Sequence, residues 1–180
     1  MPTLAALLPS RREATVVRRL RGGDLANFHA YRSSEGLARF QGWTPMSRAS
    51  AAAFLEAGAV VQNLAPGQWV QLGIAERDTD ELIGDVGLFL EPGGKCIEVG
   101  FTLSYGSQGL GHATRAVRIA LALVFATTDA TEVRAVADAR NAAALGVLER
   151  AGFEWVTERQ ADFKGETCSE RIYLYRRSAA

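Results

Sequence analysis

The sequence predicts a mixed α/β fold. Three alternating runs between residues 69 and 104 are separated by turn residues, which is typical of an antiparallel meander. The period of the apolar residues then changes from 2 to 3.6 directly after a glycine-rich turn at 106–111. The chain continues with a strand, a helix and two more strands, so that helices and strands alternate around one sheet.

The first elements have recognisable ends. Residues 15–20 are rich in β-branched side chains and predict a strand that stops at two glycines. Asp24 follows and can cap a helix that runs to Ser33. Ser47 can cap a second, alanine-rich helix that runs to Glu56.

The second half contains the clearest helix. Its apolar positions are spaced i, i+3, i+4, i+7, i+8 and i+11, which gives one buried face. They are Ala113, Ala116, Val117, Ala120, Leu121 and Val124. Another helix is expected over 141–150, with Gly152 as its C-cap. The remaining expected strands cover residues 69–76, 81–90, 96–104, 133–137, 153–161 and 172–176.

Composition limits the class of protein. The chain has 180 residues, 48% of them hydrophobic, and we expect a single domain over 1–180 with a flexible N-terminus at 1–12. Lys plus Arg equals Asp plus Glu at 20 each, so no net field draws the protein to nucleic acid or to an anionic membrane. No apolar stretch is long enough to span a bilayer. Cys96 and Cys168 have no disulfide or metal spacing, which favours a cytoplasmic protein without a metal.

The turn at residues 106–113 carries the strongest chemical signal. Its glycines allow close approach of a ligand, and the helix that follows offers free N–H groups at the positive end of its dipole. A phosphate or pyrophosphate is expected there. The spacing GxxGxG differs from the dinucleotide fingerprint and lacks the Lys-Ser/Thr of a phosphate loop, which disfavours a nucleotide-binding domain. The alternative is that the glycines only tighten a turn.

Four segments together resemble the GNAT superfamily of acyl-CoA N-acetyltransferases, in particular its ribosomal-protein-alanine (RimJ/RimL-type) branch. The resemblance extends over residues 15–177. The segments are LIGDVGL at 82–88, EVGFTL at 98–103, QGLGHA at 108–113, and Asn141 followed by VLERAGF at 147–153. The resemblance implies a central, mixed, mostly antiparallel sheet of about seven strands, flanked by helices and splayed beside the 98–103 strand.

The same resemblance implies where acetyl-CoA binds. Pantetheine is expected in the splayed gap, bonded to the backbone of Phe101, Thr102 and Leu103, with Asn141 reaching the pantetheine arm or the acetyl end. The pyrophosphate is expected on the N–H groups of Gln108, Gly109, Leu110, Gly111, His112 and Ala113. The chain departs from the family pattern at Gly106, where relatives have Arg or Gln. It also departs at Ala144 and Leu148, where relatives carry a hydroxyl that protonates the leaving thiolate.

The expected chemistry is direct attack of a neutral amine on the thioester in a ternary complex. Glu98 is the expected general base, and a backbone N–H near Phe101 is expected to stabilise the oxyanion. The alternative for Glu98 is a structural ion pair with an arginine. Asp85 is a second choice of base, while Cys96 is expected to be buried and inert and His112 to be a surface side chain.

The acceptor amine is expected to meet aromatic side chains of the first half of the chain. These are Phe28, Tyr31, Phe40 and Trp43, of which Trp43 lies in the Gly/Pro loop 40–45. Core packing of the helices is the alternative, above all for Phe28 and Phe40. The acceptor is a protein N-terminus or a small-molecule amine, and a homodimer is expected. A non-catalytic acyl-CoA sensor is the competing function.

Overall fold

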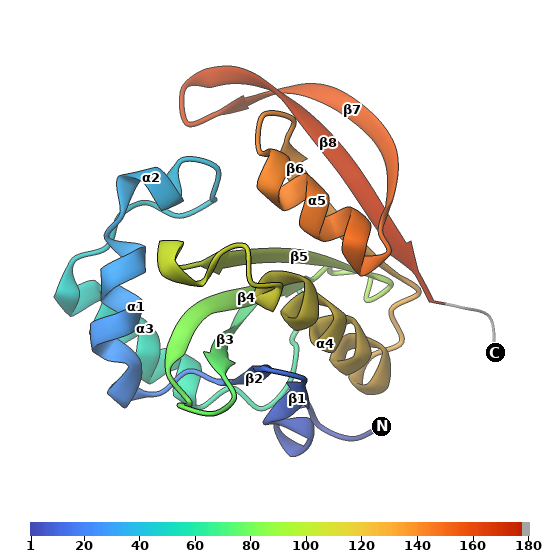
Figure 1. Ribbon diagram of the computed structural model, residues 1–180. Coiled ribbons are helices and arrows are strands. Elements are labelled where there is room, and N and C mark those ends of the chain that lie inside the picture. The colour runs from blue at the N-terminus through green and yellow to red at the C-terminus, as the bar shows by residue number, and fades with distance from the viewer. Residues whose placement is uncertain (178–180) are drawn as a thin grey trace.

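A computed structural model describes residues 1–177, an α/β fold with one eight-stranded sheet in the order β1-β2-β3-β4-β5-β6-β8-β7 (Figure 1). The strands are β1 Ser10–Arg12, β2 Thr15–Arg19, β3 Trp69–Glu76, β4 Leu82–Leu90, β5 Cys96–Leu103, β6 Glu132–Asp138, β7 Glu154–Phe163 and β8 Glu166–Arg176. The α-helices are α1 Leu25–Arg32, α2 Glu35–Ala38, α3 Arg48–Ala59, α4 His112–Thr127 and α5 Ala142–Ala151. Short 3₁₀ helices are η1 Leu4–Leu7, η2 Gly22–Asp24 and η3 Tyr105–Ser107. None of the helices in the described part of the chain is long and apolar enough to cross a membrane.

The sheet divides into two parts between β5 and β6. Within each part neighbouring strands are antiparallel: β1 to β5 form one part, and β6, β8 and β7 form the other. Strands β5 and β6 are parallel and pair only through Cys96–Glu98 and 132–134, after which they separate. The expectation of a mixed, mostly antiparallel, splayed sheet is therefore confirmed, with β1 as the additional strand.

The two faces of the sheet carry separate cores. The larger core lies beneath α4 and α5, and the smaller one beneath α1 and α3. All six apolar positions predicted for α4 are buried, as its amphipathic pattern requires. Strand β4 shows the division: Val86 belongs to the larger core, while the adjacent Asp85 contacts Arg32 of α1 on the opposite face.

The N-terminal segment differs from the sequence expectation. Residues 1–12, expected to be flexible, contain η1, whose Leu4 is buried in the larger core, and β1, which pairs with β2. The helix cap expected of Asp24 is also wrong, because its side chain makes no capping bond to α1. Its carboxylate instead accepts bonds from Arg18 at 2.8 Å and from the Arg21 N–H at 2.9 Å.

Candidate active site

The turn before α4 has the geometry of an anion site. Gly109 and Gly111 have φ of 76° and 81°, in the left-handed region that favours glycine. Helix α4 begins at His112, and its first backbone bond runs from the Arg115 N–H to the Gly111 carbonyl at 3.1 Å. Within residues 1–177 no acceptor lies in hydrogen-bonding range of the N–H groups of residues 109–111. These N–H groups, at the positive end of a 16-residue helix, can bind a phosphate.

Arg115 supports this turn from the first turn of the helix. Its Nη2 donates to the Leu110 carbonyl at 2.7 Å, and its Nε donates to Thr15 Oγ1 at 2.9 Å. A Cβ on Gly111 would lie 2.8 Å from Arg115 Nη1, the movable end of a flexible side chain, so it is the φ of 81° rather than this contact that favours glycine here. The guanidinium group adds positive charge beside the free N–H groups.

Thr114 is a polar residue of the same helix turn that the sequence analysis missed. It is only 8% exposed, and its Oγ1 has no hydrogen-bond partner in residues 1–177. A buried hydroxyl without a partner destabilises the fold, so its position in the first turn of α4 makes it a candidate donor to a phosphate at this helix end. The available signal was the hydroxyl residue that directly follows the glycine-rich turn and Ala113.

His112 was expected to be a surface side chain, and this is wrong. The imidazole is 5% exposed, and its Nδ1 lies 2.9 Å from Thr15 Oγ1 of β2. Burial, followed by the charge of Arg115, lowers the pKa of His112. The side chain is therefore a structural contact between α4 and the sheet, which leaves only the backbone N–H of His112 to contribute to an anion site.

The edge of β5 beyond Glu98 is not paired with β6. The Ser104 N–H donates to Ile83 of β4, so by alternation the polar backbone groups of Thr102 also face β4. Those of Phe101 and Leu103 face the opposite way, into the gap. Their carbonyls accept bonds from the side-chain amides of Gln41 at 3.2 Å and Gln108 at 3.1 Å. Of the three residues expected to bond pantetheine, two present backbone groups there, and Thr102 does not.

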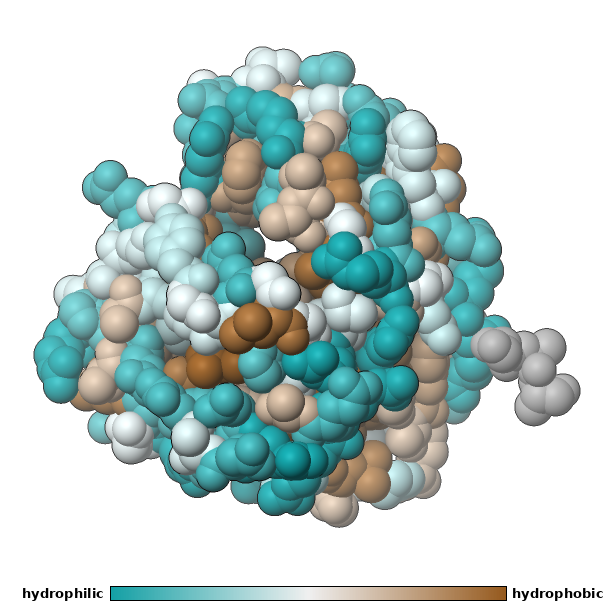
Figure 2. All heavy atoms as spheres, viewed as in Figure 1, coloured by the Kyte–Doolittle hydropathy of each residue, from teal (hydrophilic) through white to brown (hydrophobic). Residues whose placement is uncertain are grey.

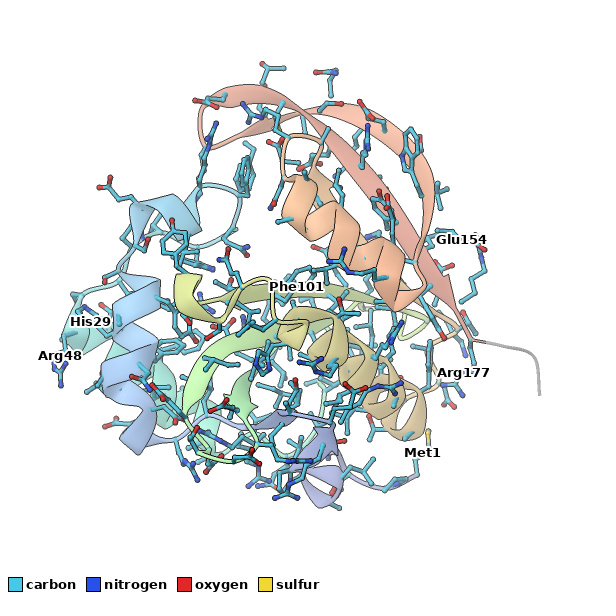
Figure 3. All side chains as sticks on the ribbon, in the orientation of Figure 1. Met1, His29, Arg48, Phe101, Glu154 and Arg177 are labelled. Carbon is cyan, nitrogen blue, oxygen red and sulfur yellow. The ribbon has the colours of Figure 1, made fainter. Side chains whose placement is uncertain are left out.

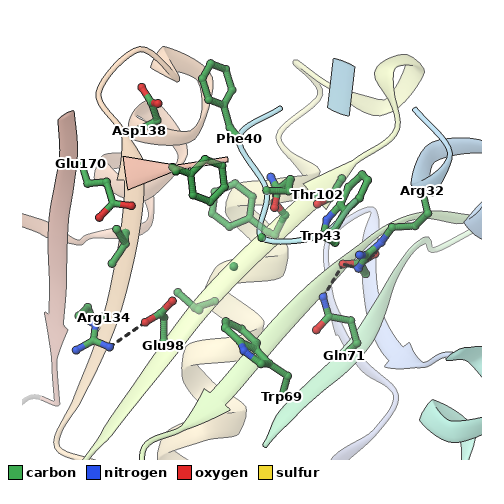
Figure 4. A pocket seen from close by; sticks show the side chains of 18 of the residues that line it. Arg32, Phe40, Trp43, Trp69, Gln71, Glu98, Thr102, Arg134, Asp138 and Glu170 are labelled. Atoms are coloured by element: carbon green, nitrogen blue, oxygen red, sulfur yellow. Dashed lines mark hydrogen bonds and ion pairs between the residues drawn. The ribbon is translucent and has the colours of Figure 1, made fainter. Parts of the chain in front are cut away.

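A cleft of about 580 Å³ lies where β5 and β6 separate (Figure 4). Figure 2 shows an opening near the middle of the molecule, and in the same orientation Figure 3 labels Phe101 near the middle of the molecule. Four carboxylates line the cleft, and each is paired with an arginine. The pairs are Arg32–Asp85 at 2.8 Å, Arg134–Glu98 at 2.8 Å, Arg140–Asp138 at 2.8 Å and Arg159–Glu170 at 2.9 Å.

Glu98 is the last residue of β5 that pairs with β6. Its register partner is Arg134, and Arg134 Nη2 donates to its Oε2 at 2.8 Å and to Glu91 at 2.6 Å. The side chain of Glu98 is 29% exposed and lines the cleft. The structural ion pair and an accessible position on the cleft wall thus occur together, because Glu98 contacts Arg134 while its side chain remains partly exposed.

Asp85, the second choice of base, is fully buried. Its carboxylate accepts bonds from Arg32, from the Tyr31 hydroxyl at 2.7 Å and from the Gln71 amide at 3.0 Å. Burial, followed by the charge of Asp85, raises the pKa of Tyr31 well above its usual value. Because its acceptor positions are occupied by donors, Asp85 is a structural centre of the cleft floor and is poorly placed to take a proton.

The aromatic residues expected to hold the acceptor divide into two groups. Trp43 and Phe40 line the cleft. Phe28 is 0% exposed in the smaller core, and Tyr31 is buried there with its hydroxyl on Asp85, so neither forms the wall that was expected of it. Aromatic lining residues that sequence reasoning missed are Phe54, Trp69, Phe101 and Phe163.

Asn141 and Cys96 have local roles. Asn141 Oδ1 accepts from the Ala144 N–H at 3.2 Å and so caps α5 at the end of β6. This bond engages the side-chain oxygen of Asn141, the residue that was expected to reach the pantetheine arm or the acetyl end, and leaves its amide nitrogen for that role. Cys96 is buried, and burial raises its pKa to about 11, which keeps the thiol protonated and matches the expected inert role.

Comparisons with known proteins agree with this geometry. A family profile described as "Acetyltransferase (GNAT) domain" matches residues 15–154. No significant match is found among curated proteins. Similar solved structures include a GNAT-family acetyltransferase from Bacillus anthracis (TM-score 0.81, 15% identity, covering 92% of this chain and 96% of that chain). RimL, a ribosomal L7/L12 α-N-protein acetyltransferase in complex with coenzyme A, has a TM-score of 0.79 and 15% identity (93% and 97% covered). Spermidine N-acetyltransferase from Vibrio cholerae, in complex with CoA and spermine, has a TM-score of 0.77 and 16% identity (92% and 96% covered).

Proposed function

This chain belongs to the GNAT family of acetyltransferases, and on that premise we propose that it transfers the acetyl group of acetyl-CoA to a primary amine. The acceptor is a protein N-terminus, as in the RimJ/RimL-type branch, or a small-molecule amine. The observation that carries the proposal is the pair of cofactor features on one side of a splayed sheet. These are the free N–H groups before α4 and the unpaired edge of β5 beyond Glu98.

The cofactor is proposed to bind along these two features. The N–H groups of residues 109–113 would bind the pyrophosphate, with Thr114 Oγ1 and the charge of Arg115 beside them. The expected contribution of Gln108 is wrong for its backbone, because its N–H donates to the Tyr105 carbonyl at 3.3 Å. Pantetheine would lie along β5 and bond the backbone of Phe101 and Leu103, displacing the glutamine amides that occupy their carbonyls. The thioester then reaches the cleft near Glu98.

The reaction proposed is a direct transfer. The amine nitrogen attacks the thioester carbonyl, the C–S bond breaks, and the thiolate of CoA leaves and takes up a proton. Glu98 is proposed to accept the proton of the attacking amine, through a water, because its carboxylate is accessible in the cleft. A free backbone N–H at Phe101 is proposed to stabilise the negative charge on the carbonyl oxygen.

The acceptor side is proposed to be the aromatic cleft. Trp43 and Phe40 provide flat apolar walls, and the paired carboxylates provide polar contacts for a cationic amine. Free thiols at Cys96 and Cys168 support our proposal of a cytoplasmic location. The proposed homodimer rests on the family resemblance and is tested by sedimentation analysis.

The test is release of CoA thiol from acetyl-CoA in the presence of an amine panel. The panel contains short peptides with a free N-terminus, polyamines and aminoglycosides. We expect thiol release with at least one class, together with acetylated product in the mass spectrum. Binding of acetyl-CoA without thiol release from any acceptor would instead identify the competing function, a non-catalytic acyl-CoA sensor.

A further inference from the structure

The tip of the β7–β8 hairpin has a residue that its backbone does not favour. Lys164 and Gly165 have φ of 52° and 81°, and the closing pair of the hairpin is Phe163 with Glu166. Two left-handed residues in a two-residue hairpin loop define a type I′ turn, for which Asn-Gly or Asp-Gly is preferred. The chain has 2 lysines and 18 arginines, and one of these lysines occupies the unfavourable position. Since the turn itself does not favour lysine, the contacts of the lysine side chain must explain why it occurs here.

The ammonium group of Lys164 bonds to a segment far away in the sequence. Its Nζ donates to the carbonyl of Ala38, at the end of α2, at 2.6 Å and to the carbonyl of Trp43 at 2.7 Å. Figure 1 shows the hairpin tip reaching across to α2 and the loop that follows it. Lys164 is an exposed residue whose ammonium group is partly desolvated, which lowers its pKa, and the two carbonyl oxygens satisfy two of its three donors.

Both segments joined by Lys164 line the cleft. The α2–α3 loop, residues 39–47, contributes Phe40, Gln41 and Trp43, and the hairpin contributes Arg159 and Phe163. The loop is held on its other side as well, because Gln41 Nε2 donates to the carbonyl of Phe101 on β5. The loop therefore spans the cleft between the hairpin and the edge of β5.

We propose that Lys164 is a positioning residue for the amine acceptor: it fastens the β7–β8 hairpin to the α2–α3 loop and so holds Phe40 and Trp43 as the outer wall of the cleft. This role rests on the proposed acetyl transfer, since an acceptor must occupy the cleft. Without the link the wall keeps its contacts with α1, through the Met46 N–H bond to Arg32 at 2.9 Å and the Arg32 guanidinium 4.6 Å from the Trp43 ring, but no other hydrogen bond within residues 1–177 joins it to the hairpin. Pantetheine is proposed to displace its Gln41 bond to β5, so without Lys164 the acceptor is oriented less well. The cofactor features before α4 are made by other elements and keep their geometry.

The test variant is Lys164→Asn, which removes the ammonium group and supplies a residue suited to the type I′ turn. Lys164→Arg keeps a cationic donor and serves as the rescue variant. Lys95→Asn is the matched control, because Lys95 is the other lysine and is exposed in the β4–β5 turn. Hydrogen–deuterium exchange over residues 38–46 reports the link directly, and steady-state kinetics report its effect on the acceptor.

In Lys164→Asn we expect faster exchange over residues 38–46 and a KM for the acceptor raised about tenfold, with the KM for acetyl-CoA unchanged. Lys164→Arg should recover most of the loss, and Lys95→Asn should match the wild type. Unchanged exchange in Lys164→Asn would overturn the link. Faster exchange with unchanged acceptor KM would overturn the positioning role. If the wild type acetylates no amine, the proposed function fails, and the exchange measurement still decides the link.

Discussion

Arg32 and Asp85 form a two-point ion pair in the floor of the cleft. Arg32 Nη2 donates to Asp85 Oδ1 at 2.8 Å and Nε donates to Oδ2 at 3.0 Å, and the two side chains are 2% and 1% exposed. The guanidinium group also lies 4.6 Å from the ring of Trp43. The pair thus joins α1, β4 and the α2–α3 loop on one face of the sheet.

Replacing Asp85 by Asn should destabilise the fold strongly. The amide keeps the shape of the carboxylate but leaves the buried charge of Arg32 without its counter-ion, at a cost of about 3–5 kcal/mol. Urea unfolding measures the change. The control is Asp78→Asn, which removes an exposed partner of Arg77 and should change the free energy of unfolding by less than about 0.5 kcal/mol. Equal, small losses in both variants would contradict this account of the cleft floor.

Glu98→Gln should slow turnover more than it weakens binding. We expect kcat to fall about a hundredfold, the size of a general-base contribution, with little change in the affinity for acetyl-CoA. Glu91→Gln is the matched control, because Glu91 also pairs with Arg134 but is not among the residues that line the cleft. A fully active Glu98→Gln enzyme would remove Glu98 from the mechanism and leave it as a partner of Arg134.

Thr114→Val should separate binding from stability. The change removes a buried hydroxyl that has no partner in residues 1–177, so the free energy of unfolding should stay the same or rise slightly. The affinity for acetyl-CoA should fall about five- to tenfold, as expected for one lost hydrogen bond to a phosphate. Calorimetric titration and thermal melting measure the two effects. Unchanged affinity would show that the hydroxyl does not face the ligand.

His112 should make stability depend on pH. Its folded pKa lies below the unfolded value of about 6.5, so the unfolded chain binds the proton more readily. Above the unfolded pKa the imidazole is neutral in both states, and its full contribution to the free energy of unfolding is present. That contribution is lost as the pH falls from the unfolded pKa through the folded pKa. Urea unfolding at pH 7.5 and pH 5.5 should show a larger loss for the wild type than for His112→Gln. Equal losses in the two proteins would contradict the assignment.

The features predicted correctly from sequence are those set by local patterns. The apolar face of α4, the cap at Ser47 and the left-handed Gly152 after α5 each depend on residues a few positions apart. The glycine turn before α4 was accessible for the same reason, because Gly109 and Gly111 are adjacent to the helix that they precede, while the anion expected there stays a prediction.

The features that sequence missed depend on contacts between distant segments. His112 is buried because Thr15 lies beside it, 97 positions away, and the helix cap expected of Asp24 gave way to an ion pair with Arg18. Lys164 bonds to backbone carbonyls more than 120 positions earlier. No periodicity or motif encodes such pairs, since they follow from the packing of strands that the chain brings together only when folded.

Binding of acetyl-CoA to Gly109→Glu tests the central placement of the cofactor most directly. Gly94→Glu is the matched control, because both glycines have positive φ, of 76° and 70°, and an added Cβ meets no atom within 4 Å at either position. The two variants should therefore show similar thermal melting. By calorimetric titration, Gly94→Glu should bind acetyl-CoA like the wild type and Gly109→Glu should not bind it, because the new carboxylate repels the pyrophosphate. Wild-type affinity in a folded Gly109→Glu protein would contradict the placement of the diphosphate at the start of α4.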